Sequence, residues 1–322
     1  MARKGAKIAL TYFITIFMTL LIIGGICYLL LQRMLNPTAS SDMPDLEQIG
    51  AADSYIPSAD NNKNALFIFD SEKRMSGCCF MIVRMIATEQ RLVFMPIPAD
   101  TCANTDGTEN SIYEFYRMSG SRKAVSAVES ALGIDIDYYI KFNNDSFKDI
   151  VSIFGGVDYN IPYNLIYSDT DTGEETIFRE GVTYIDADSI RKLITYPLYT
   201  SGEEYRAKVM GVIISDLVNK NVTDGFSSHI DDYFSMVINS SVETNYTAYD
   251  YGEQSEAMKY IADSNEYVSR FVSVTGAYNE NSLFVLDENF IKAVPEWLQI
   301  ESPAESETER VTQATTEFIF PQ

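Results

Sequence analysis

Residues 133–162 (GIDIDYYIKFNNDSFKDIVSIFGGVDYNIP) constrain the fold more than any other stretch of this chain. Apolar side chains first alternate at period two, which is typical of a half-buried strand. Residues 143–146 supply turn and helix N-cap chemistry, and residues 147–154 have apolar side chains at helical spacing. Gly155 and Gly156 end that helix because glycine adopts left-handed conformations without steric cost. The stretch therefore predicts a strand, a helix and a second strand over residues 157–161.

Similar patterns place other elements along the chain and predict an α/β fold. Short apolar runs predict strands at 65–70, 78–86, 91–97, 267–275 and 283–286. Apolar residues at helical spacing predict helices at 110–118, 122–132, 189–196, 202–219, 230–238, 254–262 and 289–298. The turn at residues 87–90 between two of the strands indicates a hairpin.

An uncharged apolar run over residues 8–31 is long enough to cross a bilayer as one helix. The basic residues of the 1–7 tail place that tail in the cytoplasm and the bulk of the chain outside it, at the cell membrane. A cleaved signal peptide is disfavoured because the run is long and no small-residue cleavage site follows. Residues 32–63 are polar and read as a linker, and residues 301–322 as a disordered tail.

Charge and histidine content exclude several classes of function. The net charge is −22, and residues 1–33 carry four basic residues and no acid, so the remainder carries −26. An acidic field of this size repels nucleic acid, which we exclude as a partner. His229 is the single histidine of the sequence, so a multi-histidine metal site and a Ser-His-Asp triad are also disfavoured.

Residues 137–162 resemble the central unit of the LytR-CpsA-Psr proteins of Gram-positive bacteria, which share an IDYY strand, a helix and a GGV turn leading to a proline. The resemblance extends roughly over residues 65–218. It implies a central mixed sheet flanked by helices, following the N-terminal transmembrane helix. We expect a LytR-CpsA-Psr-like domain at residues 64–222 and a C-terminal α/β extension of the same domain at residues 223–300.

The resemblance also implies a chemistry. Enzymes of this family transfer a glycopolymer from a polyprenyl-pyrophosphate carrier to peptidoglycan, which requires cations around the pyrophosphate and carboxylates that hold Mg²⁺. Asp100 and Arg206 match family motif positions, and Glu203 stands where the family has aspartate. The resemblance thus suggests Asp100, Arg206 and Glu203 as catalytic residues and Asp100 and Glu203 as Mg²⁺ ligands. Arg84 is a further candidate, with Arg206, for binding phosphate.

Four family positions have lost their charged residue. Cys78 replaces a carboxylate, and three arginines are replaced by Ala99, Thr195 and Val209. Each missing contact to phosphate is worth about 1.5–3 kcal/mol in a partly desolvated pocket. We therefore expect a pseudoenzyme of cell-envelope biogenesis that binds a lipid-linked envelope ligand or a partner protein. Restoring the four charges together should then tighten the binding of a polyprenyl pyrophosphate.

Two other functions remain open. One is an active Mg²⁺-dependent phosphotransferase that attaches glycopolymers from polyprenyl carriers to peptidoglycan, and the other is a scaffold without a pocket. An apolar groove wide enough for a prenyl chain would argue against the scaffold. Structural roles also remain open, because Asp100 could be a turn cap and Arg206 a helix-surface ion pair.

Three cysteines follow the apolar run, at Cys78, Cys79 and Cys102. An extracytoplasmic location permits a disulfide, and Cys102 lies just beyond the strand that pairs with the strand starting at Cys78. A bridge from Cys102 to Cys78 or Cys79 is one hypothesis, and free buried thiols are the other.

Overall fold

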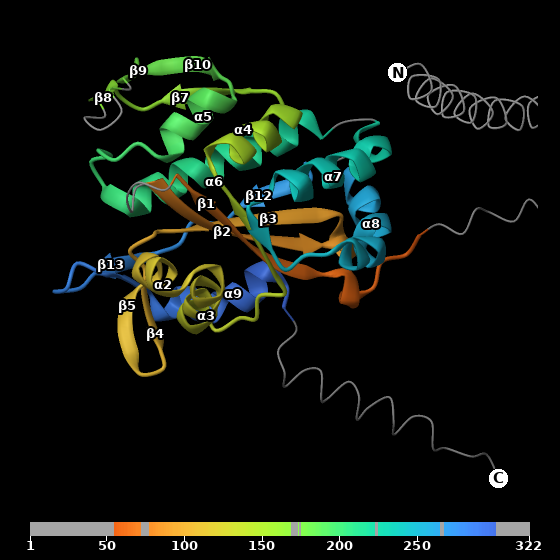
Figure 1. The fold of residues 1–322 in the computed structure, drawn as a ribbon, viewed down its shortest axis with the longest axis horizontal. Coiled ribbons are helices and arrows are strands. Elements are labelled where there is room, and N and C mark those ends of the chain that lie inside the picture. The colour runs from red at the N-terminus through yellow and green to blue at the C-terminus, as the bar shows by residue number, and fades with distance from the viewer. Residues whose placement is uncertain are drawn as a thin grey trace, which may run out of the picture. The chain divides into compact units, whose positions relative to one another are not determined.

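A six-stranded mixed sheet forms the centre of the computed structural model, which describes residues 55–71, 77–168, 173, 175–222, 225–264 and 267–300 (Figure 1). Its strand order is β11-β6-β1-β2-β3-β12. The strands are β1 (Lys63–Asp70), β2 (Cys78–Ile86), β3 (Arg91–Ile97), β6 (Tyr138–Phe142), β11 (Glu243–Thr244) and β12 (Ser269–Phe271).

Pairing within the sheet is mixed, as expected. β1, β2 and β3 pair antiparallel, while β6 runs parallel to β1 and β12 parallel to β3. Asp70 lies opposite Cys78, and Phe80 lies opposite Ile97, so the end of β1, the start of β2 and the end of β3 share one edge of the sheet. Because successive side chains in a strand point to opposite faces, Cys78 and Cys79 pack into different cores.

One face of the sheet is covered by three helices, which lie below the sheet in Figure 1. They are α2 (Ile112–Ser119), α3 (Ser121–Leu132) and α9 (Glu288–Leu298). Two hairpins border this face, β4 (Cys102–Thr105) with β5 (Thr108–Ser111) and β13 (Gly276–Tyr278) with β14 (Phe284–Leu286). The N-cap of α2 is Ser111, whose hydroxyl accepts a hydrogen bond from the Glu114 amide at 3.1 Å.

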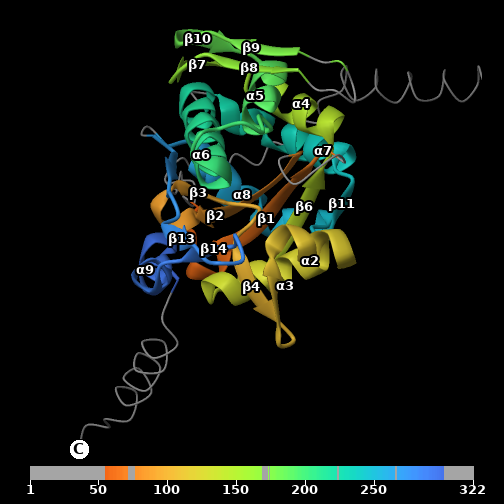
Figure 2. The ribbon, with the colours of Figure 1, turned by 90° about the vertical axis from the view of Figure 1, so that its left-hand side faces the viewer.

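Five helices pack on the other face, and most of them lie above the sheet in Figure 1 and in the turned view of Figure 2. They are α4 (Asn144–Ile153), α5 (Ala187–Ile194), α6 (Gly202–Asn221), α7 (Ile230–Ser240) and α8 (Ala248–Ala262). The short turn η4 (Phe226–His229) precedes α7. Asn143 caps α4 as its sequence predicts, by accepting hydrogen bonds from the amides of Asp145 and Ser146. The predicted helices on both faces are confirmed, with ends shifted by a few residues.

The second strand of the opening motif does not join the central sheet. β7 (Val157–Ile161) pairs antiparallel with β10 (Gly181–Ile185), and β8 (Leu165–Ser168) pairs with β9 (Glu175–Phe178), in two small sheets beyond α5 (Figure 2). The chain turns away at Gly155, whose φ is 75°. Gly156 is required for the close approach, because a Cβ there would lie 2.5 Å from the Ile185 carbonyl oxygen.

The described fold begins at Tyr55, inside the segment expected to be a linker. Tyr55 makes an edge contact with Tyr260 of α8 at 5.8 Å between ring centroids, and η1 (Ala59–Asn61) precedes β1. None of the helices in the described part of the chain is both long and apolar enough to span a membrane. The predicted transmembrane run at 8–31 and the predicted tail at 301–322 lie outside the described residues.

The disulfide hypothesis is not supported, because Cys78, Cys79 and Cys102 are free thiols in the structure. Cys78 points to the α2 side of the sheet and Cys79 to the α6 side. Burial raises the pKa of both thiols, which keeps them protonated and unreactive near neutral pH.

Candidate functional site

The candidate site lies at the sheet edge where β2 begins, β3 has ended and α6 starts. Asp100 follows β3, and Glu203 and Arg206 lie one turn apart in the first turns of α6. The structure thus brings together the three residues that the sequence suggested as catalytic. Their charges influence one another, since both Glu203 and Arg206 affect the pKa of Asp100.

Arg206 is 4% exposed, and all of its N–H groups are engaged within the protein. Its Nε donates to both carboxylate oxygens of Glu203, at 3.2 and 3.0 Å, and one terminal nitrogen also donates to Glu203. This terminal nitrogen, Nη2, also donates to the Cys78 carbonyl oxygen at 2.9 Å. The other terminal nitrogen, Nη1, donates to the Ile194 carbonyl oxygen at 2.9 Å and to the Cys79 sulfur at 3.0 Å. A guanidinium has five N–H donors, so none remains for a phosphate in this arrangement.

Asp100 is 8% exposed, and its Oδ1 has no hydrogen-bond partner. Burial raises the pKa of the Asp100 carboxyl to about 6, and the negative charge of Glu203 adds to the shift. A hydrogen bond from the Tyr278 side chain and the charge of Arg206 oppose it. Tyr278 comes from β13 and is absent from the residues expected in the site, since nothing in its local sequence pattern links it to Asp100.

The raised pKa of Asp100 predicts a pH-dependent stability. The carboxyl binds its proton more tightly in the folded state than in the unfolded state, so its stabilising contribution is present below pH 4 and is lost as pH rises to about 6. Between these values the melting temperature of the parent should fall relative to that of Asp100→Asn, whose side chain does not titrate. Thermal melts of both proteins from pH 4 to about 7 measure this difference, and parallel curves would contradict it.

At the four positions where the resemblance implies a missing charge, the side chains pack or bond within the protein. Ala99 and Val209 are buried in the cores on either side of the sheet. Thr195 is half-buried, and its hydroxyl donates to the Arg191 carbonyl at 2.8 Å. Cys78 donates from its sulfur to Asp70 Oδ1 at 3.4 Å. Two of the three positions at which the resemblance implies an arginine thus hold buried apolar side chains.

Arg84 does not lie with the other candidates. It is buried near the other end of β2, where its Nε donates to the Leu298 carbonyl at 2.9 Å and a terminal nitrogen donates to the Gln299 carbonyl at 3.2 Å. These are carbonyls at the end of α9, where a cation is favourable. The geometry therefore gives Arg84 a role in holding α9 on the sheet, away from Asp100 and Arg206.

A second polar cluster surrounds Asp70, on the α2 side of the same edge. The Asp70 carboxylate accepts a hydrogen bond from the Tyr116 hydroxyl and lies 3.4 Å from Lys141 Nζ. Lys141 also lies over the Tyr116 ring, 5.3 Å from its centroid. No local sequence pattern marks this cluster, because Asp70 resembles the polar end of a strand and Lys141 a solvent-facing residue in one.

The donor set does not fit a protein-built Mg²⁺ site. Glu203 is committed to Arg206, which leaves the unpartnered oxygen of Asp100 as a single carboxylate donor. Within the described residues, no three carboxylate, thiol or imidazole side chains are arranged to hold a metal ion. Mg²⁺ is usually held by one or two carboxylates together with waters and substrate phosphates, so Asp100 is one candidate ligand and not a complete protein-built site.

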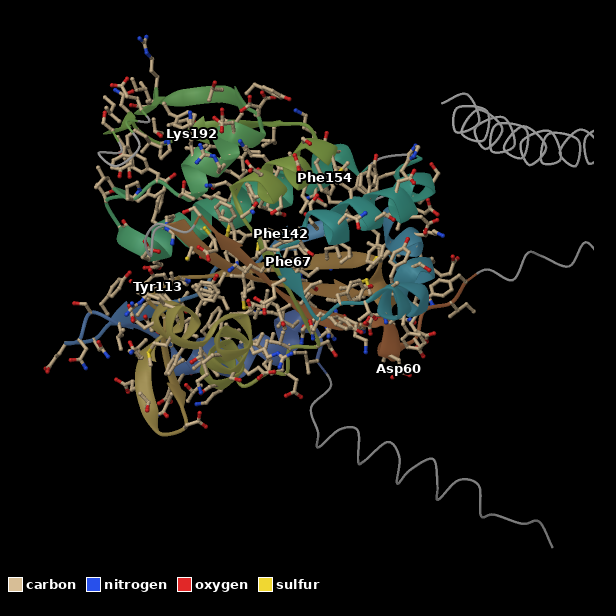
Figure 3. The ribbon with its side chains drawn as sticks, in the orientation of Figure 1. Asp60, Phe67, Tyr113, Phe142, Phe154 and Lys192 are labelled. Atoms are coloured by element: carbon tan, nitrogen blue, oxygen red, sulfur yellow. The ribbon has the colours of Figure 1, made fainter. Side chains whose placement is uncertain are left out.

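An apolar cavity of about 360 Å³ lies between the sheet and helices α4, α6, α7 and α8. Figure 3 shows two of its lining residues, Phe67 and Phe142, between the sheet and these helices, and their ring centroids are 5.5 Å apart. Phe154, beyond the end of α4, also lines it. At the sheet edge the lining includes Cys79, whose sulfur contacts Arg206. The cavity therefore extends to Cys79, which contacts Arg206 of the candidate site.

The comparisons with known proteins agree on one family and one fold. The LytR_cpsA_psr family model matches residues 70–295. The polyisoprenyl-teichoic acid–peptidoglycan teichoic acid transferase TagU of Bacillus subtilis is 25% identical over 252 residues, which cover 76% of this chain and 80% of TagU.

Solved structures show the same fold. A crystal structure of a protein from Eubacterium siraeum superposes with a TM-score of 0.67 and 22% identity, over 76% of this chain and 94% of its own. TagT bound to LIIa-WTA superposes with a TM-score of 0.56 and 18% identity, over 76% of this chain and 94% of its own.

Proposed function

We propose that this chain, which belongs to the LytR_cpsA_psr family, binds a lipid-linked intermediate of cell-envelope glycopolymer synthesis and transfers its glycopolymer poorly or not at all. The prenyl chain of the intermediate would occupy the apolar cavity, which extends to Cys79 at the sheet edge.

The apolar cavity is the observation that carries this proposal. Its lining is almost entirely aliphatic and aromatic, so it favours an uncharged hydrocarbon over a polar ligand. The helix α7 supports this, because none of its eleven residues is buried although Phe234, Val237 and Ile238 line the cavity. An inserted chain would cover these side chains, at about 25 cal/mol per Å² of apolar surface removed from water.

The bonding of the charged residues at this edge of the sheet supports the proposal that the glycopolymer is transferred poorly or not at all. A phosphotransferase must stabilise the charge that develops when the phosphoanhydride bond breaks and the polyprenyl monophosphate leaves, and guanidinium groups do this best. Here Arg206 is fully engaged with Glu203, Cys79 and backbone carbonyls, and Ala99 and Val209 fill two other positions with apolar atoms. Asp100 and Glu203 would also repel a phosphate at the same edge.

The named relatives support the envelope part of the proposal. TagU is a teichoic acid transferase that acts between a polyisoprenyl-linked polymer and peptidoglycan, and TagT has been solved with LIIa-WTA bound. We propose that this chain handles a ligand of the same general kind. We also propose that residues 8–31 anchor it in the cell membrane with the bulk outside, where such lipid carriers present their glycans.

A working phosphotransferase remains the second candidate, and Asp100 is the observation in its favour. Its unpartnered Oδ1 and its pKa of about 6 suit a group that exchanges a proton with a substrate hydroxyl near neutral pH. Rapid release of polyprenyl monophosphate from a polyprenyl-pyrophosphate-linked glycan by the unmodified full chain, abolished by Asp100→Asn, would establish this candidate over the first.

Blocking the cavity tests the first candidate. Val83 of β2 lines the cavity, and Val83→Trp would fill part of it, while Val182→Trp places the same ring on the exposed side of β10 as a matched control. We expect the full chain in detergent to bind a fluorescent polyprenyl monophosphate, and Val83→Trp to bind it at least about tenfold more weakly, a loss of about 1.4 kcal/mol. Val182→Trp should bind as the parent does. Equal affinity in all three proteins, or none in the parent, would contradict the proposal.

A further inference from the structure

Among the four helices that line the apolar cavity, α7 is the one least anchored in the core. Helices α4, α6 and α8 each bury several residues, whereas α7 buries none. Its half-buried side chains Phe234, Val237 and Ile238 line the cavity, while Met236 lies outside the lining and is 43% exposed. A segment with few buried apolar contacts opens at a lower free energy than the rest of a fold. Of the four helices, α7 is therefore the easiest to displace.

The backbone on either side of α7 allows the helix to move while the sheet stays in place. The chain enters η4 and α7 from Gly225, whose φ is 87°, a conformation that glycine adopts without steric cost. Ser241 follows the helix in an extended conformation. The next residue, Val242, is held at the edge of the sheet, because its amide donates to the Lys141 carbonyl at 2.8 Å. Residues 226–240 therefore form a unit that can turn between these two points.

Contacts with two side chains of α8 hold α7 closed at one side. Asp231, in the first turn of α7, accepts a hydrogen bond from the Tyr251 hydroxyl and lies 3.4 Å from Lys259 Nζ. The Tyr251 ring also stacks on the Phe234 ring, with centroids 3.7 Å apart. Asp231 is exposed and both α8 side chains are only half-buried, so water can replace these polar contacts. The contacts are therefore weak enough to break and reform within the folded protein.

At its other side α7 meets α4 through aromatic rings alone. Phe226 of η4 stacks on Phe154, with ring centroids 5.6 Å apart, and packs against Tyr233 of α7 at 4.8 Å (Figure 3). All three side chains line the cavity. At the sheet edge, by contrast, the lining ends at Cys79, where Arg206 is held by hydrogen bonds to the protein. A hydrocarbon can separate aromatic rings without leaving a polar group unpaired, so the α7 side is the easier passage into the cavity.

We propose that α7 is a gate, which moves away from α4 and α8 to admit a hydrocarbon chain to the cavity and closes again over it. The contacts of Tyr251 with Asp231 and Phe234 set the fraction of molecules in which the gate is open. The inference rests on the proposed function for the identity of the hydrocarbon, and it adds how access to the cavity is regulated. The movement itself can be measured without any lipid.

Thiol labelling of the full chain in detergent measures the opening. Ile140 lines the cavity and is 6% exposed, so the thiol of Ile140→Cys should react with N-ethylmaleimide only when a wall of the cavity opens. Ala127→Cys is the matched reporter, because Ala127 is fully buried in the core on the opposite face of the sheet. Mass spectrometry reads either thiol in the same tryptic peptide, residues 124–141, which has no cysteine of its own.

Tyr251→Phe removes the hydrogen bond to Asp231 and keeps the ring. We expect this change to raise the labelling rate of Ile140→Cys about tenfold, because it removes a hydrogen bond to a charged group from the closed state alone. The rate of Ala127→Cys should stay the same, and Tyr249→Phe, at an exposed tyrosine of the same helix, should change neither rate. No labelling of Ile140→Cys, an unchanged rate in Tyr251→Phe, or equal acceleration of both reporters would overturn the gate.

Polyprenyl monophosphate distinguishes the gate from the proposed function. Added to the Ile140→Cys protein, it should slow labelling at least about tenfold, because the bound chain fills the cavity and the closed gate covers it. Labelling that responds to Tyr251→Phe and not to the lipid would keep the gate and overturn the proposed function. Protection by the lipid, with labelling that is the same in Tyr251→Phe, would overturn the gate and leave the proposed function standing.

Discussion

Replacing Arg206 with methionine is expected to lower the free energy of unfolding by about 3–5 kcal/mol, the cost of removing one partner from a buried ion pair. The substitution would leave the carboxylate of Glu203 without its cation and would remove the hydrogen bonds to the Cys78 and Ile194 carbonyls. Methionine fills much of the same volume, so the loss should come mainly from these polar groups. Urea unfolding followed by circular dichroism measures it.

Two further variants show whether the ion pair is responsible. Arg117 forms an exposed pair with Glu114 at the same i,i+3 spacing, so Arg117→Met should change stability by less than about 1 kcal/mol. In the double variant Arg206→Met with Glu203→Gln the buried charge is gone, and part of the loss should be recovered. A single variant Arg206→Met as stable as the parent would show that the guanidinium is available for another role, which would favour the transferase candidate.

Replacing Val209 with arginine is expected to be as damaging, by about 4 kcal/mol, because it buries a charge without a partner. Val209 is 2% exposed and packs in the core between α6 and the sheet. The sequence suggested that arginine could be restored at positions 99, 195 and 209 together with an aspartate at position 78. The structure corrects this expectation, because Cys78, Ala99 and Val209 are all buried and the combined variant should not fold.

Thr195 is the matched control for this prediction. It is half-buried at the end of α5, so an arginine there can extend its head into water. Thr195→Arg should change the free energy of unfolding by less than about 1 kcal/mol. Thermal melts and urea titrations of the two variants provide the comparison. A stable, soluble Val209→Arg protein would mean that the α6 side of the site is open enough to hold a cation.

The sequence by itself determined the helices, the longer strands and one pairing of the central sheet, the β2–β3 hairpin. Period-two and helical patterns depend on which side of an element is buried, and this information is local. The predicted β2–β3 hairpin places Cys78 opposite the residues that follow β3. The structure has the same register, with Phe80 opposite Ile97. The family motifs also identified Asp100, Glu203 and Arg206, which do lie together.

Tertiary structure alone decided what these residues can do. The local sequence around Arg206 cannot show whether its N–H groups bind a ligand or the Cys78 and Ile194 carbonyls. Those acceptors lie 128 and 12 residues away along the chain. The same holds for the departure of β7 from the sheet, which depends on a close contact between Gly156 and Ile185. The cavity lining draws on residues throughout 63–268, and Tyr278 reaches Asp100 from 178 residues downstream. The hydrogen-bond partners of Arg206 and the walls of the cavity come from segments that are distant in the sequence. No local sequence pattern can therefore encode them.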